Sequence, residues 1–136
     1  TATTEIYTLP YTTLFRSRAA SKIAKILMGK NKINYLPNKI KGDSVIIVNA
    51  DKIKVTGKKI TQKIYYRHSG YPGGLKSTSL KEILKKDSTY AIKHAVKGML
   101  PKNKLQKLLL KKLRIYPGSH HPHLSQKPHI IEIGKI

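Results

Sequence analysis

The sequence predicts an α/β fold in which helices cover both faces of a small sheet. An amphipathic helical pattern spans Arg18–Met28, and a short β-branched run occupies Val45–Val48 between turn-forming residues. More amphipathic patterns follow Ser79. A β-branched apolar run suits a strand that is buried on both faces, which requires helices on each side of the sheet. The length of 136 residues fits one domain.

The helix predicted over Arg18–Met28 depends on apolar residues that recur every three or four positions. Lys22 and Lys25 fall on the opposite face, and Gly29 is placed to end the helix. The predicted buried face consists of Ala19, Ala20, Ile23, Ala24 and Leu27.

A second strand is predicted downstream of the buried one. The segment Asp51–Lys63 alternates lysine with β-branched residues around Gly57, which predicts a turn or short helix. The strand itself is expected over about Gln62–His68. Side chains alternate along a strand, so its faces would carry Ile64, Tyr66 and His68 on one side and Lys63, Tyr65 and Arg67 on the other.

Three helices are predicted in the second half of the chain. Ser79 and Glu82 have the spacing of a capping box, which starts the first of them. Asp87 and Ser88 begin the second, whose predicted buried face is Ala91, Ile92, Ala95, Val96 and Met99. Pro101 interrupts the pattern, because proline fits only the first turn of a helix. The third helix carries Leu105, Leu108, Leu109 and Leu113.

The end of the chain reads as a short strand followed by an arm. Leu113–Tyr116 is the predicted strand, Pro117 and Gly118 turn the chain, and the histidine-rich stretch from Ser119 to Pro128 is expected to be extended. We therefore divide the chain into one domain over residues 18–118 and an extended C-terminal arm over residues 119–136.

The charge balance predicts a polyanionic partner. The chain has 28 Lys and Arg residues against 6 Asp and Glu, a formal net charge of +22, which attracts polyanions and strains the isolated fold by self-repulsion. Cysteine is absent from the sequence, which excludes disulfides and thiolate metal sites. No run approaches the length of a membrane span and no secretion leader is evident, so we expect a soluble, unsecreted protein.

The segment Tyr65–Ser77 combines cations, aromatic rings and glycines in one loop. Three glycines between Gly70 and Gly74 let backbone amides approach phosphate oxygens, and Arg67, His68 and Lys76 add positive charge. Such contacts suit irregular RNA, with Tyr71 able to stack or to bond a sugar. A plain surface turn is the alternative. A nucleotide-binding phosphate loop is excluded, because the glycine spacing and the lysine position are wrong.

Catalytic and metal sites are not predicted. His120, His121 and His123 lie in a proline-containing stretch without a nearby carboxylate, which argues against a zinc site. The acidic residues show no pair at a catalytic spacing and are Glu5, Asp43, Asp51, Glu82, Asp87 and Glu132. We therefore expect a protein without enzymatic activity, cofactor or small-molecule substrate.

Several strings in order resemble the bacterial large-subunit ribosomal protein L-thirteen family. They include the loop Tyr65–Lys76, the stretch Lys97–Lys104, and His121-Pro122-His123, within a match over residues 18–126. The resemblance implies a three-layer α/β/α sandwich around a small, mostly parallel four-stranded sheet. It also implies binding to large-subunit ribosomal RNA beside neighbouring ribosomal proteins, a role in early subunit assembly, and no enzymatic activity. The expected location is the cytoplasmic ribosome, with an organellar ribosome left open.

Residues 1–17 depart from the family. Family members carry an apolar strand there, whereas the string from Pro10 to Ser17 resembles a translated sequencing adapter and the chain lacks an initiating Met. We hypothesise that residues 1–17 are not native, and sequencing the gene across its start tests this. Recovery of the same string there would refute the hypothesis. Whether Glu5–Leu9 docks as the first strand is left open.

The candidate RNA-binding residues form two sets. A hairpin group is Lys58, Lys59, Arg67, His68, Ser69, Gly70, Tyr71, Pro72, Gly73, Gly74 and Lys76, and a second basic group is Lys97, Lys102, Asn103, Lys104, Lys107, Lys111 and Lys112. Two rivals remain. A nucleoid-type DNA-binding protein would share the charge but lacks a recognition helix. A cationic membrane-surface protein would use residues 101–113, whose leucines are better explained as core.

Overall fold

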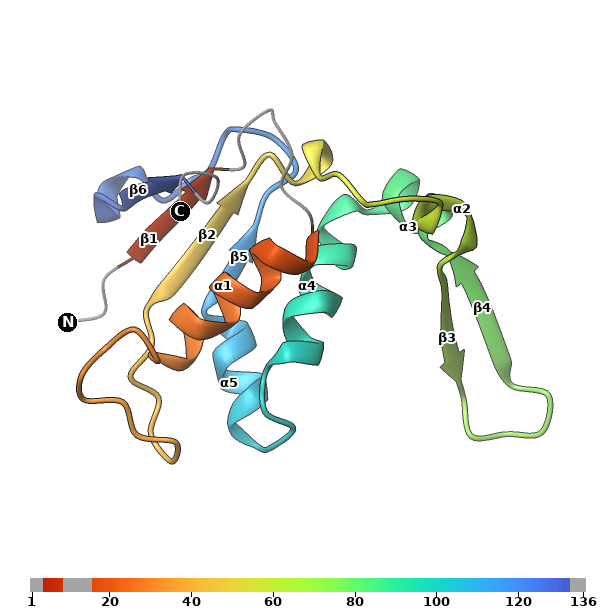
Figure 1. The fold of residues 1–136 in the computed structure, drawn as a ribbon, viewed down its shortest axis with the longest axis horizontal. Coiled ribbons are helices and arrows are strands. Elements are labelled where there is room, and N and C mark those ends of the chain that lie inside the picture. Colours follow the sequence, from red (N-terminus) through yellow and green to blue (C-terminus); the bar gives the residue numbers. More distant parts are fainter. Residues whose placement is uncertain (1–3, 9–15, 133–136) are drawn as a thin grey trace.

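The computed structural model describes residues 4–8 and 16–132, which form a parallel four-stranded sheet, a separate β-hairpin and five α-helices. The sheet order is β5-β2-β1-β6, and the hairpin consists of β3 and β4 (Figure 1). The strands are β1 (Thr4–Thr8), β2 (Ser44–Val48), β3 (Ile64–His68), β4 (Leu75–Ser79), β5 (Leu113–Ile115) and β6 (His129–Glu132). The helices are α1 (Arg16–Met28), α2 (Lys59–Gln62), α3 (Leu80–Lys86), α4 (Ser88–Met99) and α5 (Leu105–Lys111), with 3-10 turns η1 (Ala50–Lys52) and η2 (Leu124–Gln126).

The predicted α/β fold with a small parallel four-stranded sheet is confirmed. Strand β2 lies between β5 and β1, and its central residues are buried on both faces, as its β-branched sequence predicts. Strand β1 pairs in parallel with β2 from Thr4 opposite Ser44 to Thr8 opposite Val48. The first strand, whose docking the sequence left open, therefore occupies an inner position of the sheet. Its other neighbour is β6.

One face of the sheet packs on helices α1 and α4. Val45 and Ile47 point into this core, where they meet Ile23 and Leu27 of α1 and Ile92 of α4, all at most 1% exposed. Such close burial of aliphatic side chains supplies most of the hydrophobic stabilisation of a domain. The periodicities that predicted α1 and α4 are confirmed, with one difference at the end of α4.

That difference is the exposure of Met99, and the third predicted helix also differs from its prediction. Met99, the last residue of α4, is 41% exposed, and Leu108, in the middle of α5, is 45% exposed. Leu113 belongs to strand β5 rather than to the third helix. Leu109 is the residue of α5 that enters the core.

The opposite face of the sheet is covered by the chain that follows β5. Ile46 and Val48 pack there against Tyr116, whose hydroxyl lies 2.7 Å from Nε2 of His123. The stretch predicted as an extended arm contains η2, and the chain then returns to the sheet edge as β6. Strand β6 was not predicted from the sequence.

The connection between α1 and β2 is fixed by backbone contacts. Gly29 has φ +78° and its amide donates to the Ile26 carbonyl at 3.0 Å, which ends α1 as predicted. Gly42 lies so close to α1 that a Cβ built on it would stand 1.8 Å from the Leu27 carbonyl oxygen. Lys32 closes the connection with an ion pair to buried Asp43 at 2.6 Å.

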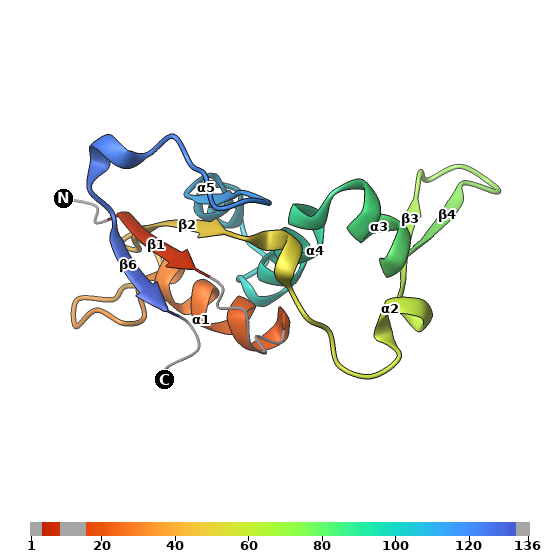
Figure 2. The ribbon, with the colours of Figure 1, turned by 90° about the horizontal axis from the view of Figure 1, so that it is seen from above.

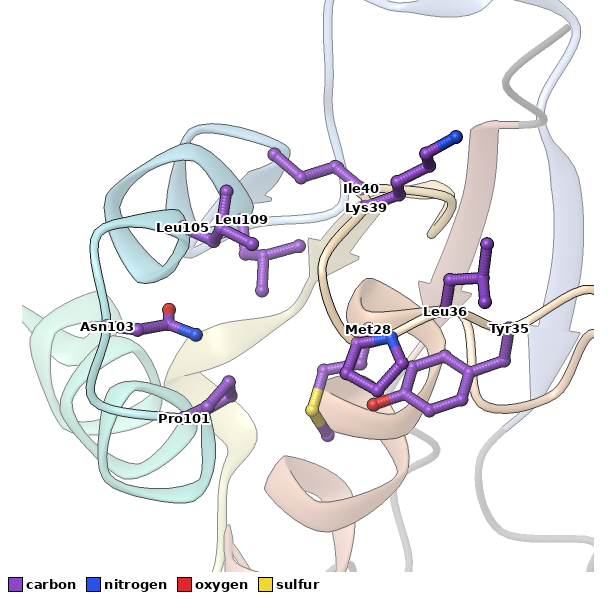
Figure 3. Close-up of a pocket in the computed structure, with 10 residues that line it drawn as sticks. Met28, Tyr35, Leu36, Lys39, Ile40, Pro101, Asn103, Leu105 and Leu109 are labelled. Atoms are coloured by element: carbon purple, nitrogen blue, oxygen red, sulfur yellow. The ribbon is translucent and has the colours of Figure 1, made fainter.

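A small pocket separates this connection from the start of α5 (Figure 3). Its volume is about 20 Å³, room for about one water molecule, so it is too small for a metabolite. Its walls are largely apolar and come from Met28, Tyr35, Leu36, Pro37, Lys39, Ile40, Pro101, Asn103, Leu105 and Leu109.

Candidate nucleic-acid interface

The β3–β4 hairpin extends away from the body of the molecule in both views (Figures 1 and 2). The second predicted strand is confirmed as β3, but its partner β4 was not predicted, and the two pair with each other outside the main sheet. The loop Ser69–Gly74 therefore caps a hairpin instead of joining a strand to a helix. This geometry presents the loop to solvent on all sides except its base.

A tight turn shapes the tip of the hairpin. The amide of Gly74 donates to the carbonyl of Tyr71 at 3.0 Å, with Pro72 and Gly73 at the central positions and Gly73 at φ +72°. Proline followed by a residue of positive φ is the arrangement of a type II turn, which favours glycine at the third position. A Cβ on Gly74 would stand 2.0 Å from Oγ of Ser69.

A second contact holds the turn from the other strand. The amide of Gly70, at φ +87°, donates to Nδ1 of His68 at 2.9 Å. Nδ1 of His68 is therefore an acceptor within the loop, and the Nε2 side of the ring is the side available to a partner. A Cβ on Gly70 or Gly73 would meet nothing within 4 Å, so the bare backbone there faces open space.

Two cations stand opposite each other on the hairpin. The register pairs Arg67 of β3 with Lys76 of β4, and both side chains are exposed. Directly opposed residues of an antiparallel pair project on the same face, where like charges destabilise the pairing. Within the described part of the chain, neither cation has a carboxylate partner. A bound polyanion would remove this repulsion.

The base of the hairpin is anchored to the body by aromatic rings. The Tyr65 ring lies 5.1 Å from the ring of His94 and 6.3 Å from that of Tyr90, both on α4 and both edge-on. Nζ of Lys63 lies 5.4 Å from the centre of the Tyr65 ring. The carbonyl of Lys63 accepts the amide of Leu80, the first residue of α3, at 2.9 Å. These contacts fix the direction in which the hairpin leaves the body.

The remaining hairpin-group lysines lie at the foot of the hairpin. Lys58 immediately precedes α2 and Lys59 begins it, and both are exposed. Helix α2 packs beside α3 and β4, so these two lysines share the hairpin's side of the molecule (Figure 2). The structure therefore brings the predicted hairpin group together on one protruding unit.

The second basic group surrounds the connection between α4 and α5. Lys97, Lys102, Lys104 and Lys107 are exposed there. Asn103 has a structural role, since its Oδ1 accepts the amide of Gln106 at 3.1 Å at the start of α5. The side chain of Asn103 turns toward the small pocket (Figure 3).

A groove of about 500 Å³ runs along α4 beside this group. Its lining includes Lys97, Lys102 and His94, the residue whose ring also contacts Tyr65 of the hairpin. The groove therefore lies on the side of α4 that faces the hairpin base. Gln106 closes one end, where its Nε2 donates to the Lys97 carbonyl at 2.9 Å.

The last two lysines of the second basic group differ from each other. Lys112 is half-buried and its Nζ donates to the carbonyl of Gly42 at 2.8 Å, so it links β5 to the start of β2. Lys111 is exposed and lines a groove of about 270 Å³ with Arg114 and His123. Arg114 and His123 were not among the predicted residues. Arg114 could have been found from the sequence, because the middle residue of a strand Leu113–Ile115 faces away from its two neighbours.

Other kinds of site find no support among the described residues. They contain no group of three or more His, Cys, Asp or Glu side chains that could hold a metal ion. No helix in the same ranges is long and apolar enough to cross a membrane. His121 and His123 instead lie stacked, with ring centres 6.3 Å apart, beside Tyr116.

Comparison with known proteins identifies the family of this chain. The family model described as Ribosomal protein L13 matches residues 11–122. The chain belongs to the ribosomal protein L13 family. The match begins inside residues 1–17, and the hypothesis that this segment is not native stays a prediction.

Relatives cover nearly the whole chain. The large ribosomal subunit protein uL13 of Beutenbergia cavernae is 48% identical over 130 residues, which is 96% of this chain and 88% of the relative. The uL13 proteins of Pelobacter propionicus and Thermotoga maritima are 56% and 55% identical over 116 residues, or 85% of this chain. These alignments cover 82% and 78% of the two relatives.

Proposed function

We propose that this protein is a structural constituent of the large ribosomal subunit that binds large-subunit ribosomal RNA and supports early subunit assembly. Membership of the ribosomal protein L13 family supports this role, and the family is not enzymatic. The geometry that carries the proposal is the hairpin, which holds Arg67 and Lys76 side by side on one exposed face. Neighbouring large-subunit proteins are its expected further partners.

The proposed mechanism is electrostatic and geometric. Lysines and arginines of the hairpin group displace counterions from RNA phosphates, while the glycine turn brings backbone amides close to the phosphate chain. The second basic group, along the groove beside α4, is the second proposed contact. Since phosphate contacts carry no base identity, specificity comes from the shape of the folded RNA.

Chemical footprinting of the protein on purified large-subunit RNA tests this proposal. We expect protection of a limited set of nucleotides, and we expect duplex DNA in equal phosphate concentration to compete poorly at fixed salt. Equal competition by duplex DNA would favour the nucleoid-type alternative. Absence of RNA protection at modest ionic strength would refute the proposal.

A further inference from the structure

The face of the hairpin opposite to Arg67 and Lys76 carries a row of exposed apolar and aromatic side chains. Ile64 and Tyr66 of β3 alternate with Tyr65 and Arg67 and are 45% and 66% exposed. Leu75 of β4 stands on the same face, opposite His68, and is 59% exposed. Tyr71 at the tip is 74% exposed. Large apolar side chains this exposed at adjacent positions indicate a contact surface.

We infer that this face, centred on Tyr66, stacks against unpaired nucleobases of the RNA whose phosphates Arg67 and Lys76 neutralise on the other face. The inference rests on the proposed function and assigns a different task to each side of the hairpin. Aromatic rings accept any base, because every base has a π-face. Tyr66 is the most exposed tyrosine on either strand of the hairpin and is the residue assigned to this contact.

The size of the face favours bases over a partner protein. Two strands of five residues, with strands about 4.8 Å apart and about 3.4 Å per residue, present only about 160 Å² on one face. A stable protein interface needs about 800 Å² on each partner, whereas a stacked base needs the area of one ring. The face is thus large enough for one or two bases and too small for the centre of a protein interface.

The charge of the hairpin favours the same partner. No acidic residue occurs between Lys52 and Lys81, a stretch that includes the whole hairpin. Because the hairpin is a single layer of two strands, a polynucleotide held by Arg67 and Lys76 needs only to pass around one edge of the hairpin for its next nucleotides to meet Tyr66 on the other face. The positive charge therefore favours a nucleic acid as the partner, and the aromatic face favours contact with its unpaired nucleotides.

The test compares the full-length protein with Tyr66→Ala, using Ser77→Ala as the matched control. Ser77 is directly opposite Tyr66 in the register and is exposed, so both substitutions change the same face without touching the core. Protein-free large-subunit RNA and a fully paired RNA duplex are the two probes. We expect Tyr66→Ala to weaken binding to large-subunit RNA by about 5- to 150-fold, and binding to the duplex by less than twofold.

Salt dependence separates stacking from charge. Loss of a stacked base leaves the slope of log affinity against log salt unchanged, because no counterion is involved. A second readout uses the absence of tryptophan from the chain. In Tyr66→Trp the single tryptophan should be quenched by large-subunit RNA, whereas in Ile33→Trp, at a fully exposed position of the loop after α1, it should not.

The outcomes are distinct. If wild-type protein binds large-subunit RNA and Tyr66→Ala binds equally well, the inference fails while the proposed function stands. If Tyr66→Ala weakens both probes equally, or instead abolishes binding of a neighbouring ribosomal protein, the face does not stack unpaired bases and the inference is overturned. If the wild-type protein ignores large-subunit RNA, the proposed function fails as well.

Discussion

Replacing Arg67 with glutamine should weaken RNA binding while leaving the free protein at least as stable. In the free protein Arg67 stands opposite Lys76 on the same face, a like-charge pair that costs about 0.2–1 kcal/mol. Arg67→Gln removes that repulsion and takes no side chain out of the core, since Arg67 is exposed. The free energy of unfolding should therefore be unchanged or raised by up to about 1 kcal/mol.

The effect on RNA binding should have the opposite sign. One lost phosphate contact lowers the slope of log affinity against log salt by about 0.7–0.9. Between 50 and 200 mM salt, such a slope change corresponds to a factor of about three. Arg67→Gln should thus show an affinity deficit about threefold larger at the lower salt concentration. Binding titrations of large-subunit RNA at several salt concentrations measure this, and chemical denaturation measures stability.

Lys30→Gln is the matched control for this experiment. Lys30 is exposed in the loop after α1 and lies outside both predicted basic groups. Lys30→Gln lowers the net charge by one, as Arg67→Gln does. If Lys30→Gln changed the salt slope as much as Arg67→Gln, the effect would be one of overall charge and not of the hairpin. A clear loss of stability in Arg67→Gln would also refute the reasoning, because it would show that Arg67 supports the fold.

Two further predictions concern the fold that presents the hairpin. Gly42→Ala should lower the free energy of unfolding by at least about 1–3 kcal/mol, since its Cβ would meet the backbone of Leu27 at 1.8 Å. Gly98→Ala should instead raise the free energy of unfolding by about 0.4–1 kcal/mol, because a Cβ there would meet nothing within 4 Å. Denaturant titration of both variants checks the opposite signs. Ser79→Ala should cost about 1 kcal/mol, because the Ser79 hydroxyl caps α3 by accepting the Glu82 amide at 3.3 Å; an equal loss in Ser77→Ala would contradict the capping role.

The helices and the central strand were predictable because their signals are local. Helices α1 and α4 and strand β2 each place apolar residues at the period of their own structure, and the buried positions match that period. Caps were equally visible, since Ser79 and Asp87 accept amides at the predicted helix starts. Such elements depend on residues within one or two turns of each other.

Strand β4 could not be predicted in the same way. Its sequence, Leu-Lys-Ser-Thr-Ser, has one apolar residue and no apolar alternation, because the body covers the hairpin only at its base. Without β4, Arg67 and Lys76 appear as two separate cations nine residues apart, and their position side by side on one face cannot be inferred. Composition was enough to group the hairpin residues as candidates, but their two-sided arrangement required the strand register.

The same separation explains why the hairpin is a binding element and not part of the core. A two-stranded hairpin is marginally stable alone, and this one is tied to the body chiefly at its base, through the rings of Tyr65 and His94 and the start of α3. The core around β2 does not need the hairpin's outer residues, and those residues carry a repulsive charge pair on one face and exposed rings on the other. Both features lose their cost only when a polyanion with accessible bases surrounds the hairpin. The like-charge pair and the exposed rings, which destabilise the free hairpin, are thus the groups proposed to contact RNA in the bound one.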